Sequence, residues 1–117
     1  MESNRNLDVG DAPGRKILDS GVRVALGTDS ILSAGDLDLW RDLLLAVEAY
    51  GFSPLEALRA ATLSGAEVLG LTGVYGALTP GARAAILAVR LGPGHDLGDR
   101  LITSPGRLNA ATGDEEE

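Results

Sequence analysis

Cysteine is absent from the 117-residue sequence, and histidine occurs once, as His95. The lack of cysteine excludes disulfide bonds and thiolate metal sites. A catalytic zinc ion usually takes about three protein ligands, most often histidines together with a carboxylate. Since the sequence has neither HxH nor HExxH spacing, we expect no complete imidazole-based metal site on these residues alone.

Aromatic residues are scarce at 3%, although hydrophobic residues make up 44% of the chain. We therefore expect one modest core of small and aliphatic side chains. No apolar run reaches the roughly 18 residues that a membrane-spanning helix needs. The net charge of −7 argues against non-specific nucleic-acid binding. These features predict a soluble, cytoplasmic protein that binds neither membranes nor nucleic acid.

Residues 36–50 carry the clearest helical pattern. Apolar side chains recur at three- and four-residue steps, at Leu37, Trp40, Leu43, Leu44, Val47 and Tyr50. Asp36 is the expected N-cap, and Asp42 falls with other charged residues on the opposite, solvent-facing side. In a chain that folds alone, the leucine-rich stretch of residues 40–47 is expected to remain exposed as an apolar surface.

Two further helices are predicted from residues that start and stop helices. Asp11 is a candidate N-cap, and Gly21 is placed to end that helix in a left-handed conformation. Ser53 and Glu56, with proline at the first helical position, form a capping-box pattern. The helix that they start is expected to run to residue 61, and another helical stretch covers residues 65–71.

Three segments are predicted as strands. Residues 22–27 (VRVALG) are short, rich in β-branched side chains and almost continuously apolar, as in a parallel strand buried on both faces. Residues 84–91 (AAILAVRL) and 101–103 are the other two, among glycine and proline turns. The order predicts one βα unit followed by a small β appendage.

Asp29 stands where the first of these strands ends, within the sequence GTDS. Ligands of parallel α/β proteins bind at the carboxyl ends of the strands. A carboxylate there can ligate a metal or transfer a proton. Aspartate also commonly caps a turn after a strand, so Asp29 has both a catalytic and a purely structural interpretation.

Four segments carry recognisable motifs: SNRNLDVGDAP at residues 3–13, GVRVALGTDS at 21–30, SPLEALRAATLSGAEVLGL at 53–71 and GALTPG at 76–81. In this order and at this spacing, over about residues 3–91, they resemble the C-terminal part of the metal-dependent amidohydrolase superfamily. The deaminase and chlorohydrolase branch, which acts on nitrogen-rich rings, is the most similar.

The resemblance implies a fold class, α/β. The chain would supply the last strand and helices of a (β/α)8 barrel over residues 1–71, a small β appendage over 72–105 and a flexible acidic tail over 106–117. It implies a zinc or iron site in which Asp29 is both a metal ligand and the catalytic proton shuttle. Asn4 matches a position near the substrate pocket, although capping of a loop explains it equally well.

Four features limit what the resemblance implies for this chain. Ala85 stands where the family usually has an aspartate before its strand, which affects the packing of the β appendage. His95 matches no family ligand and is interpreted as a surface loop residue, and Ser30 as a turn residue. The metal-binding histidines of the family are expected on a preceding stretch of sequence that these residues do not include.

The predicted function is the C-terminal segment of a metal-dependent hydrolase of carbon–nitrogen, non-peptide bonds, such as a deaminase of a nitrogen heterocycle. Because a single parallel strand leaves backbone groups unpaired at about 1–3 kcal/mol each, we expect the chain to be either a marginal, rearranged α+β fold or part of an assembly. We expect the chain alone to be inactive, because the other metal ligands are missing. A complementary N-terminal fragment or a homo-oligomer is the expected partner. The alternative is a non-catalytic binding or assembly module derived from the same fold.

Overall fold

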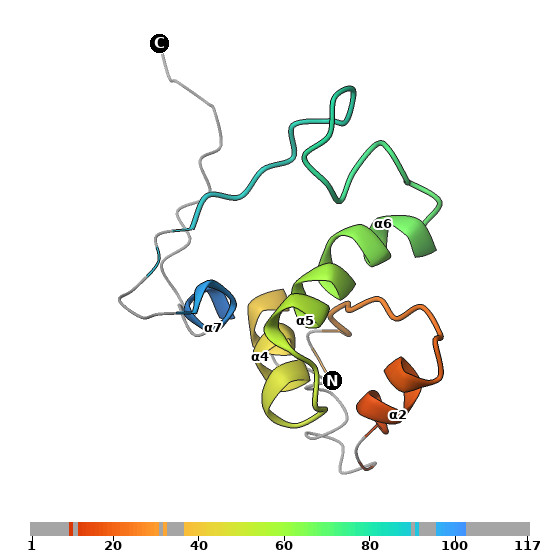
Figure 1. Ribbon diagram of the computed structural model, residues 1–117, viewed down its shortest axis with the longest axis vertical. Helices are drawn as coiled ribbons and strands as arrows, with labels where there is room; N and C mark the ends of the chain where they lie inside the picture. Colours follow the sequence, from red (N-terminus) through yellow and green to blue (C-terminus); the bar gives the residue numbers. More distant parts are fainter. Residues whose placement is uncertain are drawn as a thin grey trace.

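Helices α4 (Leu39–Glu48) and α5 (Pro54–Ala61) pack together at the centre of the molecule (Figure 1). The computed structural model describes residues 10, 12–30, 32, 37–89, 91 and 96–102. Three shorter helices complete the regular structure of this part of the chain: α2 (Gly14–Asp19), α6 (Leu63–Val68) and α7 (Leu97–Ile102). Helix α7 contacts both α4 and α5, and α6 follows α5 after a single residue.

Helix α4 begins later than the sequence pattern predicts. Its N-cap is Asp38, whose Oδ1 accepts a hydrogen bond from the Trp40 backbone N–H at 2.9 Å. Asp36, the predicted cap, lies outside the described residues. A carboxylate directly before the first turn satisfies one of the helix's free N–H groups. The chain leaves the helix through Gly51, whose φ of 74° is in the left-handed region that glycine tolerates.

Helix α5 confirms the predicted capping box. The Ser53 Oγ accepts a hydrogen bond from the Glu56 backbone N–H at 3.3 Å, and Glu56 Oε2 accepts one from the Ser53 N–H at 2.8 Å. Helix α6 starts at Leu63, two residues before the predicted stretch, and ends at Val68. Thr62 breaks the α5–α6 axis with non-helical φ and ψ of −122° and −90°.

The core lies between α4 and α5 and contains many small side chains. Its buried members are Leu43, Leu45, Ala46, Tyr50, Phe52, Ala57 and Ala60. The prediction that residues 40–47 would stay exposed is wrong, because α5 and α7 cover much of α4. Asp42, predicted on the solvent side, is only 3% exposed, since α4 is covered over more than one face.

The predicted strands are not formed in the described part of the chain. Residues 22–27 and 83–89 are extended without ladder pairing, and Leu101 and Ile102 belong to α7. The one β-bridge among the described residues joins Thr72 to Tyr75. A strand needs a neighbouring strand to pair its N–H and C=O groups. In the described part of the chain, residues 22–27 lie beside helices instead. None of these helices is long and apolar enough to cross a membrane.

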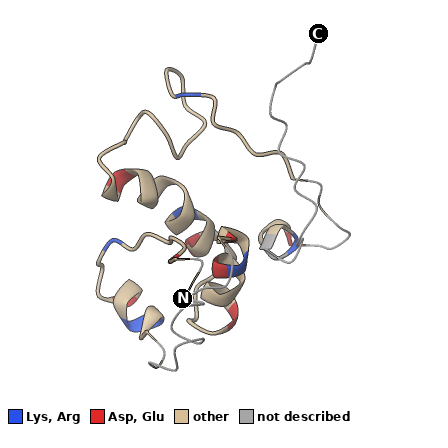
Figure 2. Cartoon of the chain, turned by 180° about the vertical axis from the view of Figure 1, so that it is seen from behind, with Lys and Arg blue, Asp and Glu red and all other residues tan. Residues whose placement is uncertain are grey.

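Residues 72–89 run away from the helices as a largely exposed segment that starts with turns and continues without regular structure from residue 83 (Figure 1). The segment carries one charged residue, Arg83, whereas acidic and basic side chains are distributed over the helices (Figure 2). Leu78 and Ile86 are 82% and 63% exposed. The segment is anchored near its start, where Gly76 lies against the Thr62 carbonyl at the beginning of α6. The predicted β appendage is therefore an unpacked stretch here, and the domain boundaries at residues 71 and 105 stay predictions.

Candidate active site

The segment that leads to Asp29 starts at the end of α2. Gly21 ends this helix with a φ of 76°, as the sequence predicts, and its N–H donates to the Leu18 carbonyl at 3.0 Å. Residues 22–30 then run extended past the α4–α5 core. The Leu26 N–H donates to the Ala60 carbonyl at 3.0 Å and so fixes the middle of the segment to the last turn of α5.

Side chains along this segment alternate between two faces. Val24, Leu26 and Thr28 are partly buried, and the first two pack against the core. Residues at the positions between them, including Ala25 and Gly27, are exposed. The prediction of a strand buried on both faces is thus wrong for this chain, because the helices cover Val24 and Leu26, whereas Ala25 and Gly27 are exposed. Extended backbone gives this period of two.

Asp29 continues the exposed series, which we call the outward face (residues 25, 27 and 29). The Asp29 Oδ1 accepts a hydrogen bond from the Ser30 backbone N–H at 2.8 Å. This local contact is the one that the structural interpretation of Asp29 requires. It occupies one carboxylate oxygen and is compatible with a second partner for the other. Ser30 is itself exposed and forms part of the same turn.

The described residues contain no cluster of three or more histidine, cysteine, aspartate or glutamate side chains that could hold a metal ion. Asp29 therefore offers a single carboxylate rather than a ligand set within this part of the chain. Asn4 and His95, the other residues considered from the sequence, lie outside the described residues. Of the two predicted site residues, the structure describes only Asp29.

Arg15 on α2 links the start of the site segment to the centre of the fold. Its Nη1 lies 3.0 Å from Glu56 Oε2 and 3.3 Å from the Gly51 carbonyl oxygen, and its Nη2 lies 2.7 Å from Asp19 Oδ1. Hydrogen bonds that Arg15 donates to the carboxylates of Asp19 and Glu56 raise the pKa of Arg15 above its ordinary value. This network was not predicted, although the Arg15–Asp19 spacing of four residues on a helix was a readable signal.

Glu56 receives most of its stabilisation from its own capping box. Hydrogen bonds from the Ser53 backbone N–H, the Arg15 guanidinium and the Ser53 hydroxyl lower the pKa of Glu56 to about 2. The carboxylate is thus charged at neutral pH and holds α2 beside α5. The side chains of Arg15 and Glu56 are 46% and 37% exposed, so solvent screens the ion pair.

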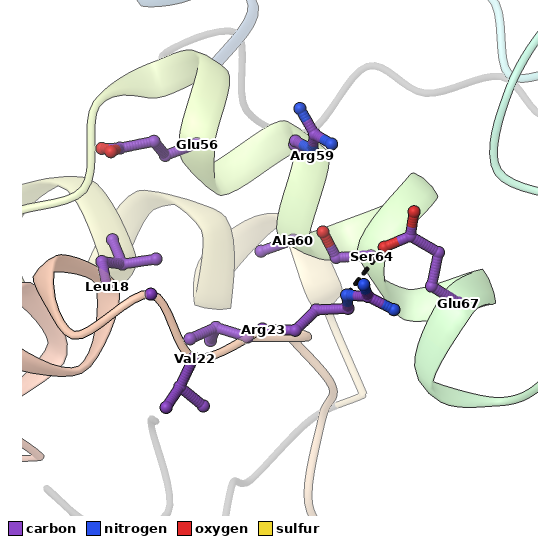
Figure 3. A pocket seen from close by; sticks show the side chains of 10 residues that line it. Leu18, Val22, Arg23, Glu56, Arg59, Ala60, Ser64 and Glu67 are labelled. Atoms are coloured by element: carbon purple, nitrogen blue, oxygen red, sulfur yellow. Dashed lines mark ion pairs between the residues drawn. The ribbon is translucent and has the colours of Figure 1, made fainter.

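A cavity of about 250 Å³ lies at the other end of the site segment, between residues 21–24 and helices α5 and α6 (Figure 3). Arg23 crosses it and pairs with Glu67 at 3.2 Å between Nε and Oε2. Glu56 and Arg59 line the rim and point away from Arg23 in this view. Asp29 does not line this cavity, so it is separate from the candidate active site.

Comparison with known proteins gives a family for the chain. A model of the amidohydrolase family matches residues 1–115. Imidazolonepropionase of Deinococcus deserti is 42% identical over 105 residues, which cover 87% of this chain and 26% of the relative. A 5-methylthioadenosine/S-adenosylhomocysteine deaminase of Pelotomaculum thermopropionicum is 40% identical over 114 residues, covering 86% and 26%.

A protein of Deinococcus radiodurans named probable guanine deaminase is 43% identical over 86 residues, which cover 68% of this chain and 20% of that protein. The chain thus spans about a quarter of the length of the curated relatives that it matches. Two of these three relatives are named as deaminases, and the third is named imidazolonepropionase.

Proposed function

The chain belongs to the amidohydrolase family, and from this premise we propose that it is the C-terminal segment of a metal-dependent hydrolase of carbon–nitrogen bonds. The proposed reaction class is hydrolysis at a nitrogen heterocycle, such as deamination. It is supported by relatives named as deaminases and as imidazolonepropionase. In this proposal the chain alone is inactive, since it spans about a quarter of those relatives.

The placement of Asp29 on the outward face is the observation that carries the proposal. The opposite face of residues 22–30 packs on the helices through Val24 and Leu26, as the outer face of a barrel strand would. The outward face then corresponds to the barrel interior. Asp29 is at the carboxyl end of this face and exposed, where a (β/α)8 enzyme positions its catalytic groups.

The described residues do not form a metal site by themselves, because Asp29 has no neighbouring group of ligands among them. The family is generally metal-dependent, and in the proposal Asp29 supplies one ligand to a zinc or iron ion whose other ligands lie on a different stretch of polypeptide. Such an ion would activate a water molecule at neutral pH.

Asp29 and Asn4 have separate roles in the proposal. A carboxylate on the outward face can accept a proton from the attacking water and return it to the leaving nitrogen. Asn4 would contact the substrate through its side-chain amide, which offers both a donor and an acceptor to a heterocycle. In the proposal, the substrate is a small molecule. The role of Asn4 is carried over from the family resemblance alone, because Asn4 lies outside the described residues.

A chimera tests the proposal. The matched segment of the D. deserti relative is exchanged for this chain, and imidazolonepropionase activity and bound metal are measured. We expect an active, metal-containing chimera in which Asp29→Asn lowers kcat by at least about a hundredfold, the usual size of a proton-transfer contribution. Asp19→Asn is the matched control, because it changes an exposed carboxylate of α2 and should leave kcat unchanged.

Equal kcat for the Asp29→Asn chimera and its parent would refute the catalytic role. A chimera that folds and contains no metal would refute the metal-dependent mechanism. That second result would favour the alternative function, a non-catalytic assembly module. The exposed apolar residues of the 72–89 segment, such as Leu78 and Ile86, are the observation that supports this alternative.

A further inference from the structure

Ser64 on α6 lines the cavity between residues 21–24 and helices α5 and α6. The residue is only 8% exposed, yet its hydroxyl forms no hydrogen bond to any residue that the structure describes. A polar group in so buried a residue is expected to have a partner. Serine also favours a helix less than alanine does, so the fold of α6 does not account for serine at this position.

Arg23 brings further unused donors to the same cavity. Its side chain crosses the cavity, and its Nε lies 3.2 Å from Glu67 Oε2 (Figure 3). A guanidinium carries five N–H donors in a planar fork. Within the described part of the chain, the two Nη groups of Arg23 form no hydrogen bond. One edge of the guanidinium is therefore available to an acceptor from outside.

The carboxylates that line the cavity are already engaged. Glu56 accepts hydrogen bonds from its own capping box and from Arg15 at 3.0 Å, and Glu67 pairs with Arg23. Arg59 lies at the rim and is exposed, and its guanidinium has no ion pair with the described residues. The lining thus has donors in excess of acceptors, which an anion complements.

We propose that this cavity binds a small monocarboxylate with a short apolar tail. The carboxylate accepts hydrogen bonds from the Nη groups of Arg23 and from the Ser64 hydroxyl, and Arg59 turns inward from the rim to share its charge. A guanidinium binds a carboxylate well because its planar fork matches the two oxygens. This binding does not require the proposed catalytic activity, since Asp29 does not line the cavity.

The apolar part of the lining gives the ligand its tail. Leu18, Val22 and Val24 line the cavity, and Val22 is 59% exposed, so a tail would remove apolar surface from water. A cavity of roughly 150 Å³ can hold benzene, so one of about 250 Å³ accommodates an acid of a few carbon atoms. The net charge of −7 repels anions from the chain as a whole, so the local donors must retain the ligand.

Titration of the 117-residue chain with butyrate tests the proposal. We expect butyrate to shift the amide resonances of Ser64 and Val22 and to raise the thermal unfolding midpoint, because it binds the folded chain. Acetate, which lacks two methylene groups, should bind about tenfold more weakly. Butylamine has the same tail and the opposite charge and should not bind.

Two variants break the same ion pair with opposite expected effects. Arg23→Gln should weaken butyrate binding by about tenfold, because it removes charged donors. Glu67→Gln should tighten it by about threefold, because it removes a competing acceptor and a like charge. Ser64→Ala should weaken binding by about fivefold without lowering the unfolding midpoint of the unliganded chain. Arg83→Gln is the matched control, since Arg83 is exposed and does not line this cavity.

Weaker binding by both Arg23→Gln and Glu67→Gln would overturn the proposal, because the ion pair would then serve only the shape of the cavity. Unchanged resonances of Ser64 and Val22 throughout the titration would overturn it too. The same holds for butylamine or inorganic phosphate that binds as tightly as butyrate, since the site would then recognise the tail alone or the charge alone. If Arg23→Gln does not fold, the directions found for Glu67→Gln and Ser64→Ala decide the question.

Discussion

Helices α4 and α5 and the extended segments at residues 22–30 and 72–89 satisfy their backbone and apolar groups in different ways. In the helices, each N–H after the first turn finds a carbonyl one turn away, side chains cap N–H groups of the first turn, and Leu43 and Ala57 are buried. In the extended segments, the described residues give few backbone partners and leave Val22, Leu78 and Ile86 more than half exposed. More than half of the residues in both kinds of segment are hydrophobic, so a lack of apolar side chains does not explain the difference.

The difference is explained by how far apart in the sequence the hydrogen-bond partners of each element lie. A helix forms its hydrogen bonds within itself, and its core face requires only one neighbouring helix. A strand requires a neighbour for every backbone group along its edge. The helices of this chain are therefore defined by its own residues, whereas a strand at the extended segments would need a neighbour that the described residues do not provide. The carboxylate with the proposed chemistry lies on an extended segment, so the proposed activity requires such neighbours.

The largest expected contrast comes from one substitution made in both regions. Leu43→Ala removes a side chain that is 2% exposed and should cost about 2–5 kcal/mol of unfolding free energy. Leu78→Ala, at 82% exposure, should change it by less than about 0.5 kcal/mol. Urea unfolding followed by Trp40 fluorescence measures both values. Similar costs would show that the 72–89 segment is packed as tightly as the helices.

The next largest effect concerns Gly76, where residues 72–89 contact the start of α6. An added Cβ at Gly76 would lie 2.8 Å from the Thr62 carbonyl oxygen and 2.9 Å from the Ala66 Cβ, at a φ of 90°. Gly76→Ala should therefore cost about 1–3 kcal/mol from overpacking, in addition to the backbone penalty of a left-handed residue. Gly70→Ala is the control, because its φ is 71° with no atom within 4 Å. Equal changes in Tm for the two variants would contradict the close contact at Gly76.

The smallest effect is the pH dependence of the Arg15–Glu56 link. The pKa of Glu56 is lowered from 4.5 to about 2 in the folded chain, so its contribution to stability is present above pH 4.5 and is lost as the pH falls toward 2. Glu56→Gln should lower the unfolding free energy at pH 6, by less than the glycine substitution does, because solvent screens this half-exposed pair. The difference from wild type should disappear near pH 2. If the difference in unfolding free energy between Glu56→Gln and wild type stayed constant from pH 6 to pH 2, the charge of Glu56 would not contribute to stability.

The helices could be predicted from sequence because their signals are local. The Ser53–Glu56 capping box and the left-handed end at Gly21 both follow from a few adjacent residues, and the structure confirms them. The start of α4 could not be placed as well, since Asp36 and Asp38 are both plausible caps and the actual cap is Asp38. The burial of Asp42 depends on contacts from other elements that no local pattern encodes.

The strands were predicted wrongly for this chain because strand formation depends on neighbours. Residues 22–27 have the composition of a buried parallel strand, and they do adopt an extended backbone. The sequence pattern indicates a strand within a sheet, and the described residues contain no such sheet. The position of Asp29 at the end of this segment was nevertheless predicted, since it requires only the extended course of the chain. Its catalytic role stays a prediction.

Amide hydrogen exchange of the isolated chain is the most direct test of the claim that residues 22–28 lack strand partners here. The account predicts strong protection in α4 and α5, protection of the Leu26 amide through its bond to Ala60, and rapid exchange at Ala25 and Gly27. Protection at Ala25 and Gly27 equal to that of the α4 amides would contradict it, because a strand would then be fully paired within this chain.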